Sequence, residues 1–309
     1  MNEKVRIVYG IHIMWYEYAL IAEHFASVKH AYLPMKEFVD LELRVFANKQ
    51  TYLETPDRDG VMDMFEEEIK SALFDEPWAP VDLTWITDEE PFYCMADQRR
   101  EVTNPEGWVV QGETDCLLPQ VFFKALSDAA TANVFTDPTY ALTWAYRKMW
   151  DFTWNHVEHP LFRMAEYQNT DIPLADRPRG CRYPYDFRDY ISQDVLDEFN
   201  KNYPTAEIMR VIPPKLDGSL LAFWRLEEKL IPDDMHIGTD DLCAMRAMDI
   251  LGIPQYHIIN VIKGHNYNHP LKRLGTSSTR DDTAYLKHKE ESQEAMERFI
   301  SELLEQEGV

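Results

Sequence analysis

The first half of the chain alternates two kinds of hydrophobic pattern, and this alternation restricts the folds open to it. Residues 5–13 and 39–47 place apolar side chains at every second position, which is typical of strands. Two further strands are predicted at 81–87 and 108–112, and helices at 16–31, 60–74, 95–102 and from Pro119 onward. Alternating strands and helices favour an α/β fold with a mostly parallel sheet, in which ligands bind at the carboxyl ends of strands.

The second half is less regular. Helices are predicted at 192–203, from Thr239, which would cap its helix, to a stop at Gly252, and at 285–306. Strands are predicted at 139–150, 218–226 and 255–262, and long loops at 170–190 and 263–282. The last helix is acidic and amphipathic, so we expect it to pack on the body of the protein or on a partner copy.

Composition narrows the classes of partner. The formal net charge is −23 over 309 residues, which repels a bare polyphosphate or nucleic-acid surface unless a local basic patch overrides it. The four cysteines are far apart and form no zinc-ligand pair or disulfide framework. The first residues lack an apolar signal core, and no apolar run approaches the roughly 18 residues of a membrane span. We therefore expect a cytoplasmic protein with reduced thiols and no membrane span.

Two carboxylates follow the predicted strand 108–112 in the segment WVVQGETDCLLP. Glu113 and Asp115 are two residues apart at the carboxyl end of that strand, where both can point into one cleft. Carboxylate oxygens are the ligands that Mg²⁺ and Mn²⁺ prefer. The pattern leaves three interpretations open, namely a solvated strand end, a metal site and half of an acid/base pair.

A second acidic pair, Asp240 and Asp241, follows Thr239 at the predicted start of a helix. The helix dipole favours the ionised form of acids in the first turn. Such residues often serve only to cap a helix. The functional alternative is a general base that takes a proton from a hydroxyl group.

Cations are concentrated in two places in this acidic chain. The segment KGHNYNHPLKR holds Lys263, His265, His269, Lys272 and Arg273. One histidine would ligate a metal and the neighbouring cations would meet phosphates, although the segment also fits a mobile basic loop. The pattern does not decide between His265 and His269. Arg99 and Arg100 suit recognition of phosphate or carboxylate, or a solvated helix face.

The order of these sites resembles that of glycosyltransferases with the GT-A fold, similar to the large family 2-type group of inverting, nucleotide-sugar-dependent enzymes. WVVQGETDCLLPQVFFKAL resembles their strand, DxD motif and following helix. GTDDLCAMRAMDILGI resembles their xED motif and helix, and DGSLLAFWRLEEKL resembles the segment that meets the acceptor. The chain has ExD in place of DxD and TDD in place of xED.

The resemblance implies a Rossmann-like sandwich over residues 1–270, with a nucleotide-sugar half at 1–118 and an acceptor half at 119–270. Residues 271–309 would form a basic loop and the C-terminal amphipathic helix. It also implies roles for individual residues. Asp115 and His265 would bind a divalent Mn or Mg ion, Asp241 would be the catalytic base with Asp240 beside it, and the nucleotide-sugar would meet Ile13, Asn48, Arg99, Arg100, Glu113, Lys263 and Arg273.

The activity implied is transfer of a sugar, with inversion, from a nucleotide-diphosphate sugar to a hydroxyl acceptor. The acceptor would be a glycan, a small molecule or a nucleic acid, and the C-terminal helix would offer a surface for a homo-oligomer. Alternatives are a metal-dependent hydrolase, a nucleotidyltransferase on the same type of fold, and a non-catalytic module that binds a sugar nucleotide.

Overall fold

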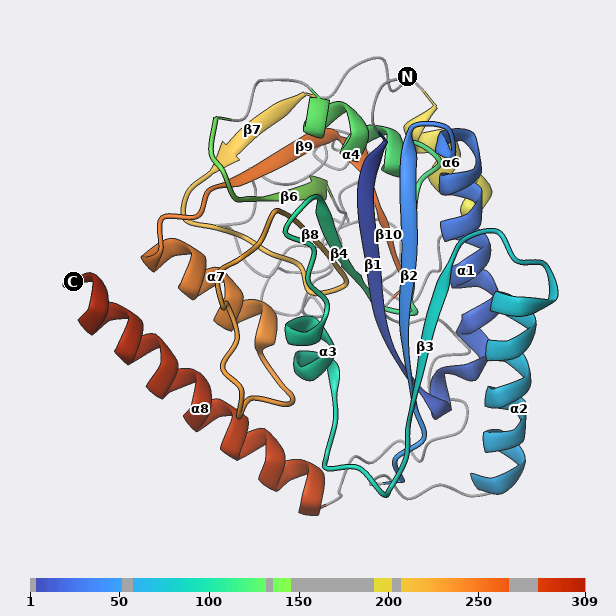
Figure 1. Cartoon of the computed structure of the whole chain (residues 1–309), viewed down its shortest axis with the longest axis horizontal. Coiled ribbons are helices and arrows are strands. Elements are labelled where there is room, and N and C mark those ends of the chain that lie inside the picture. The colour runs from blue at the N-terminus through green and yellow to red at the C-terminus, as the bar shows by residue number, and fades with distance from the viewer. Residues whose placement is uncertain are drawn as a thin grey trace, which may run out of the picture.

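A computed structural model of the chain describes residues 4–51, 58–131, 136–145, 192–201, 207–266 and 283–308. Its centre is an eight-stranded sheet with strand order β3-β2-β1-β4-β8-β6-β9-β7 (Figure 1). These strands are β1 (Val5–Met14), β2 (Val39–Asn48), β3 (Val81–Ile86), β4 (Trp108–Gly112), β6 (Tyr140–Ala145), β7 (Ile208–Val211), β8 (Leu220–Trp224) and β9 (Gln255–Ile262). β3, β2, β1 and β4 are parallel, β6 and β9 return to the same direction, and β8 and β7 run the opposite way. The predicted α/β class with a mostly parallel sheet is therefore confirmed.

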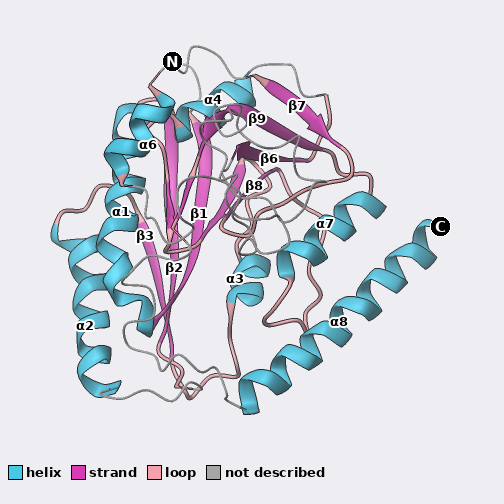
Figure 2. Cartoon of the chain, turned by 180° about the vertical axis from the view of Figure 1, so that it is seen from behind, coloured by secondary structure: helices cyan, strands magenta, loops and turns pink. Residues whose placement is uncertain are grey.

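Helices cover both faces of this sheet (Figure 2). They are α1 (Tyr18–Tyr32), α2 (Arg58–Lys70), α3 (Met95–Glu101), α4 (Phe122–Thr131), α6 (Gln193–Asn200), α7 (Asp240–Ile250) and α8 (Thr283–Glu307), with short turns at Trp15–Glu17, Leu33–Met35 and Ser71–Asp75. The alternation of β1 decides which face each residue joins. Ile7, Tyr9 and Ile11 enter the main core beneath α1, α2 and α4. Val8 joins Val102, which directly follows α3, in a separate cluster on the other face.

The structure adds three strands that the sequence patterns did not predict. β7 is a short edge strand, and its first residue, Ile208, is exposed, so it lacks a clear alternation. β5 (Cys116–Leu117) and β10 (Gly264–His265) form a separate antiparallel pair. A strand of two residues is too short to show periodicity, and β10 lies inside the segment predicted as a loop.

Helix α7 begins and ends close to the predicted residues, but its start is held differently. Thr239 makes no side-chain capping hydrogen bond, and its hydroxyl instead donates to the sulfur of Met296 (3.6 Å). Thr239 is therefore the N-cap residue, as predicted, and its carbonyl accepts from the backbone N–H of Cys243 (2.9 Å), but its hydroxyl does not cap the helix. Gly252 has φ +67, a left-handed conformation that ends the helix as predicted.

The C-terminal helix packs on the body of the same chain. Its apolar face joins α7 and the second face of the sheet in one cluster through Ala295, Met296, Ile300 and Leu303. The hydroxyl of Ser292 accepts hydrogen bonds from the backbone N–H groups of His236 (3.0 Å) and Ile237 (3.2 Å), just before α7. In the part of the chain that the structure describes, no helix combines the length and apolar character needed to cross a membrane.

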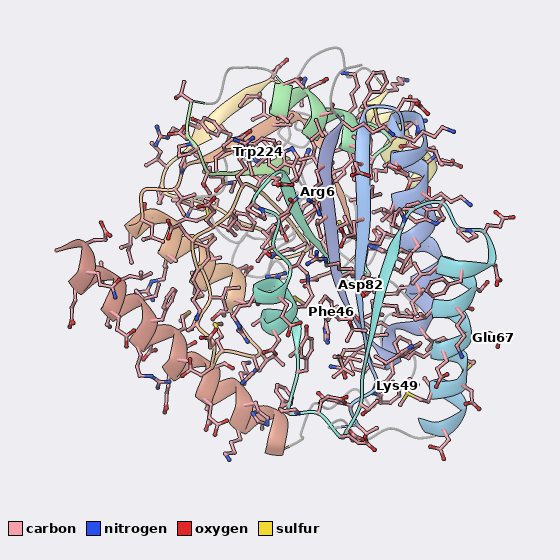
Figure 3. All side chains as sticks on the ribbon, viewed as in Figure 1. Arg6, Phe46, Lys49, Glu67, Asp82 and Trp224 are labelled. Atoms are coloured by element: carbon pink, nitrogen blue, oxygen red, sulfur yellow. The ribbon has the colours of Figure 1, made fainter. Side chains whose placement is uncertain are left out.

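A groove of about 1220 Å³ opens at the amino ends of β1, β2 and β3. Arg6, Asp82 and Trp224 line it, and Figure 3 shows Arg6 and Trp224 toward one end of the sheet, with Asp82 farther along it. Both signs of charge occur along its walls. In parallel α/β sheets ligands gather at the opposite end, where the carboxyl termini of the strands meet.

Replacement of Ile300 by Ala should destabilise the protein by about 2–5 kcal/mol, because it empties a buried position between α8 and α7. Urea unfolding followed by circular dichroism measures the change. The neighbouring exposed Glu302→Ala should change the free energy of unfolding by no more than about 0.5 kcal/mol. Equal effects of the two substitutions would contradict the docking of α8 described above.

Candidate functional site

The site forms where the end of β4 meets the beginning of β8. The two strands are antiparallel, and Gly112 at the end of β4 is opposite Leu220 at the start of β8. The backbone N–H of Glu113 donates to the carbonyl of Ser219 (3.1 Å), which extends the pairing into both turns. The residues that follow β4 and those that precede β8 therefore face one another.

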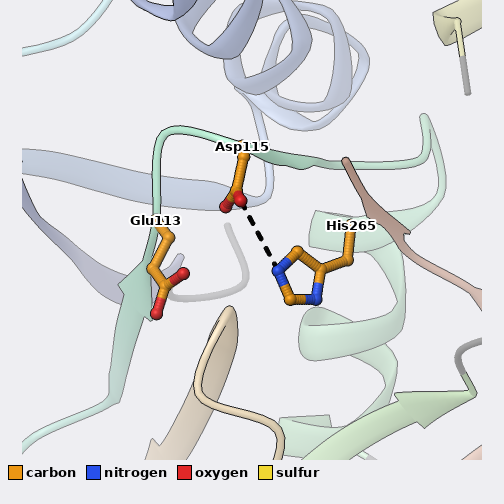
Figure 4. Close-up of side chains that lie close together, drawn as sticks. All are labelled: Glu113, Asp115 and His265. Atoms are coloured by element: carbon orange, nitrogen blue, oxygen red, sulfur yellow. Dashed lines mark ion pairs between the residues drawn. The ribbon is translucent and has the colours of Figure 1, made fainter. Parts of the chain in front are cut away.

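The β5–β10 pair brings His265 to the acidic turn. Cys116 is opposite His265 in this pair, and the backbone N–H of Asn266 donates to the carbonyl of Asp115 (2.7 Å). Figure 4 shows the His265 ring facing the Asp115 carboxylate, with 3.6 Å between Nε2 and Oδ2. Gly264 permits this approach, because a Cβ there would lie 3.1 Å from Cβ of Leu117.

Glu113, Asp115 and His265 together have the composition of a divalent metal site. One ligand atom from each lies within 4.8 Å of the other two. Ligand atoms on opposite sides of an octahedral Mg²⁺ lie about 4 Å apart, so small side-chain rotations bring the three within bonding range. Two carboxylates and one imidazole suit Mg²⁺ or Mn²⁺ better than ions that prefer sulfur. The trio fits the predicted ion, and it includes Glu113, to which the resemblance assigned a role in binding the nucleotide-sugar.

Asp217 is a site residue that the sequence analysis missed. It is 2% exposed, and its Oδ1 lies 3.7 Å from Nδ1 of His265 and 3.8 Å from Nζ of Lys263. Lys263 is equally buried, and its ammonium donates to the hydroxyl of Ser219 (2.7 Å). The only signal in the sequence is an acid directly before Gly218 at the start of a predicted strand, which is common in turns.

The buried side chain of Arg99 connects the start of α7 with the turns that follow β4 and precede β8. Its guanidinium pairs with Asp240, donates to the carbonyl of Gly218 and lies 3.6 Å from Glu113. Burial lowers the pKa of Arg99, but Asp240 and then Glu113 act against this and leave the pKa above its ordinary value. The cation is thus fixed in its charged form among carboxylates, which is the arrangement expected for a fully buried arginine.

Asp240 and Asp241 have different environments. Asp240 is buried against Arg99, whereas Asp241 is partly exposed. Burial, followed by the neighbouring Asp240 charge, raises the pKa of Asp241 to about 6. A Cβ on Gly218 would lie 3.2 Å from Oδ2 of Asp241, so the absence of a side chain at 218 leaves room beside this carboxylate. Asp241 is therefore the better placed of the two to exchange a proton with a bound molecule.

Two residues expected to meet the nucleotide-sugar, Ile13 and Asn48, are held in the interior. Ile13 is fully buried in the main hydrophobic core. Asn48 is also fully buried, and its amide donates to Nε2 of His12 (3.0 Å) and to the carbonyl of Tyr93 (2.8 Å). Their side chains stabilise the ends of β1 and β2 from within the protein and do not face the acidic residues of the site.

Arg100 binds partners other than the acidic residues of the site. Its guanidinium donates to the carbonyl oxygens of Pro232 and Met235 and pairs with Asp97. It joins α3 to the segment before α7, so of the two neighbouring arginines Arg99 is the one at the site. His269 and Arg273 lie outside the described residues.

No protein-family model matches this chain, and no curated protein matches it. Among solved structures, it is similar to S. aureus TarS 1–349 at 13% identity and a TM-score of 0.27, over 46% of this chain and 35% of that one. It is also similar to a mycobacterial protein at 14% identity and a TM-score of 0.35, over 84% of this chain and 67% of that one. Likenesses at these TM-scores do not indicate a function.

Replacement of Asp241 by Asn should alter how stability depends on pH. Because the folded-state pKa of about 6 exceeds the ordinary value of 3.8, the folded protein holds this proton more tightly than the unfolded chain does. The free energy of unfolding therefore falls as pH rises between these values. Asp241→Asn should remove this contribution and add about 1–2 kcal/mol at pH 7, allowing for solvent around a partly exposed carboxylate.

Urea titrations at several pH values measure this effect. Asp249→Asn, which alters an exposed aspartate on the same helix, is the matched control and should leave the wild-type pH profile unchanged. Parallel profiles for wild type and Asp241→Asn would show that the Asp241 carboxyl has an ordinary pKa.

Proposed function

We propose that this protein is a metal-dependent, inverting glycosyltransferase that moves a sugar from a nucleotide-diphosphate sugar to an acceptor hydroxyl. The observation that carries the proposal is that Glu113, a member of the Glu113, Asp115 and His265 trio, and the Asp241 carboxylate both lie close to Arg99 beside the β4–β8 junction. Arg99 links the trio to the base, because the charges of Glu113 and Asp241 both raise the pKa of its guanidinium. A cation site for a diphosphate and a general base near it are what this transfer requires.

The trio would hold a Mn²⁺ or Mg²⁺ ion together with the diphosphate of the donor. When bound, such an ion supplies positive charge to the phosphate oxygens as the leaving group departs. The chain itself is strongly acidic at this site, and Arg99 and Lys263 are buried in pairs with Asp240 and Asp217. Without the ion, the carboxylates would repel a diphosphate. This charge balance supports a requirement for a metal.

Asp241 would act as the base. Its carboxylate takes the proton from the acceptor hydroxyl, and the acceptor oxygen forms a bond to the anomeric carbon of the sugar. The bond between that carbon and the diphosphate oxygen breaks, and its electron pair leaves with the nucleoside diphosphate. A pKa near 6 leaves Asp241 mostly ionised at neutral pH and more basic than an ordinary aspartate. Attack on the face opposite the leaving group inverts the anomeric centre.

Asp240, which directly precedes Asp241 at the start of α7, would position this base. It is buried against Arg99, and its charge contributes to the raised pKa of Asp241. Asp240 thus fixes the arginine and strengthens the neighbouring base without contacting the acceptor.

Nucleoside diphosphates with Mn²⁺ should stabilise the wild-type protein against heat, by about 2.7 kcal/mol when the ligand is present at 100 times its Kd. Asp115→Asn should lose this stabilisation, because it removes one charged ligand of the trio. Asp82→Asn, an exposed residue at the amino end of β3, is the control and should respond as wild type does. A shift with Mn²⁺ alone and no further gain from any nucleotide would favour the metal-dependent hydrolase instead.

Asp241→Asn should lower the rate of sugar transfer by at least about 100-fold while sparing the binding of nucleotide and Mn²⁺. The wild-type rate should rise as pH increases through about 6, because the base must be ionised. Mass spectrometry of a panel of nucleotide sugars with mixed hydroxyl acceptors measures transfer and identifies the donor. A variant that kept the full rate would disprove the role of Asp241 as base.

A further inference from the structure

We infer that His24 and Ser27, on helix α1, are positioning residues for the metal site. They hold the edge of β5 that faces away from β10, and so fix the backbone that carries Asp115. This inference rests on the proposed function. Neither residue is a metal ligand, and both are buried, with His24 fully enclosed.

The two edges of β5 are satisfied by different kinds of partner. On one edge lies β10, and the N–H of Asn266 donates to the carbonyl of Asp115. In the described part of the chain no strand pairs with the other edge. There, Nδ1 of His24 lies 2.8 Å from the carbonyl oxygen of Cys116, and the N–H of Leu118 donates to the hydroxyl of Ser27 (3.2 Å).

The spacing of these contacts suits a helix face opposite a strand. Cys116 and Leu118 are two residues apart, so their backbone groups point to the same edge of an extended chain. His24 and Ser27 are three residues apart, so they lie on the same face of α1. The Ser27 hydroxyl also donates to the carbonyl of His24 (2.8 Å), which orients its oxygen to accept from Leu118. One face of α1 therefore does what a neighbouring strand would do.

The protonation state of His24 fits this arrangement. Burial lowers its pKa to about 4, so the ring is neutral and has one donor and one acceptor nitrogen. The Tyr9 hydroxyl lies 3.2 Å from Nε2, which leaves Nδ1–H to donate to Cys116. Gly112 makes room for Tyr9, because a Cβ at 112 would lie 2.1 Å from the tyrosine hydroxyl. Tyr9, His24 and Cys116 thus form a chain of hydrogen bonds that runs from β1 to the strand beside the site.

The position of Asp115 depends on this clamp. Asp115 directly precedes Cys116, and it is 2% exposed, so its carboxylate has little freedom to compensate for a backbone shift. Loss of the His24 donor leaves the buried Cys116 carbonyl without that hydrogen bond, and the strand has to move or twist to find another. Such a movement separates Asp115 from His265. The consequence is weaker metal binding, with no direct effect on the base at Asp241.

His24→Leu in the full chain should raise the Kd for Mn²⁺ alone by about 10- to 100-fold, as loss of an outer-shell partner typically does. Isothermal titration with MnCl₂ measures it. His24→Asn should recover most of the affinity, because the asparagine amide places an N–H close to where Nδ1 stands. Ser27→Ala, a smaller change that removes the second contact, should weaken Mn²⁺ binding in the same direction.

Val28→Ala is the matched control. Val28 is fully buried on the same helix and its side chain has no polar group to offer β5, so the substitution costs stability without touching the clamp. It should bind Mn²⁺ as wild type does. Circular dichroism at the titration temperature selects conditions in which every variant is folded, so that affinity is compared between native states.

The outcomes separate this inference from the function on which it rests. If wild type and His24→Leu share one Kd while Asp115→Asn binds weakly, the clamp is overturned and the metal site stands. If His24→Asn is as weak as His24→Leu, the donor is not what holds the site, and the inference is overturned. If wild type binds Mn²⁺ no better than Asp115→Asn does, the metal site fails, and the proposed function fails with it.

Discussion

The antiparallel pairing of β4 and β8 determines where the candidate site of this protein lies. When one strand of a mostly parallel sheet runs in the opposite direction, its first residue lies beside the last residue of its neighbour. Here the register sets Gly112 opposite Leu220, and the hydrogen bond from Glu113 to Ser219 continues it. Two turns that are about a hundred residues apart in the chain thereby become the two walls of one site. A parallel strand in the place of β8 would send its preceding turn, with Asp217, to the other end of the sheet.

Five carboxylates meet at this junction, from Glu113, Asp115, Asp217, Asp240 and Asp241, with two buried cations, Arg99 and Lys263, among them. The excess of negative charge has two consequences. It contributes to the raised pKa of Asp241, and it makes the trio attractive to a divalent cation. The same carboxylates therefore contribute to the raised pKa of Asp241 and to the proposed affinity of the trio for a divalent cation.

The sequence allowed the sheet to be predicted because its long strands and helices have clear periodicity. Alternation in β1 and β2 and the helical spacing of α2 carried enough signal to imply a parallel sheet and the edge at which ligands bind. Glu113, Asp115 and His265 were expected at one site, and the structure brings them together. Short-range patterns could not reveal β5 and β10, Asp217, or the helix-to-strand contacts of His24, because these depend on tertiary pairing. Arg99 and Arg100 look equivalent in sequence, and only the packing of α3 separates their roles.

The contacts that cover β5 also affect whether the protein can associate with other chains through a strand edge. A strand edge with open N–H and C=O groups is a template for a strand from another molecule, and proteins that leave such edges bare tend to associate. On β5 the outer edge meets side chains of α1, and the Leu118 carbonyl accepts a further hydrogen bond from Gln193 of α6 (3.0 Å). These side chains form hydrogen bonds with the backbone N–H and C=O groups of this edge, and unlike a strand they add no further open edge. The strand that supports the proposed metal site is thus closed to a strand from another molecule.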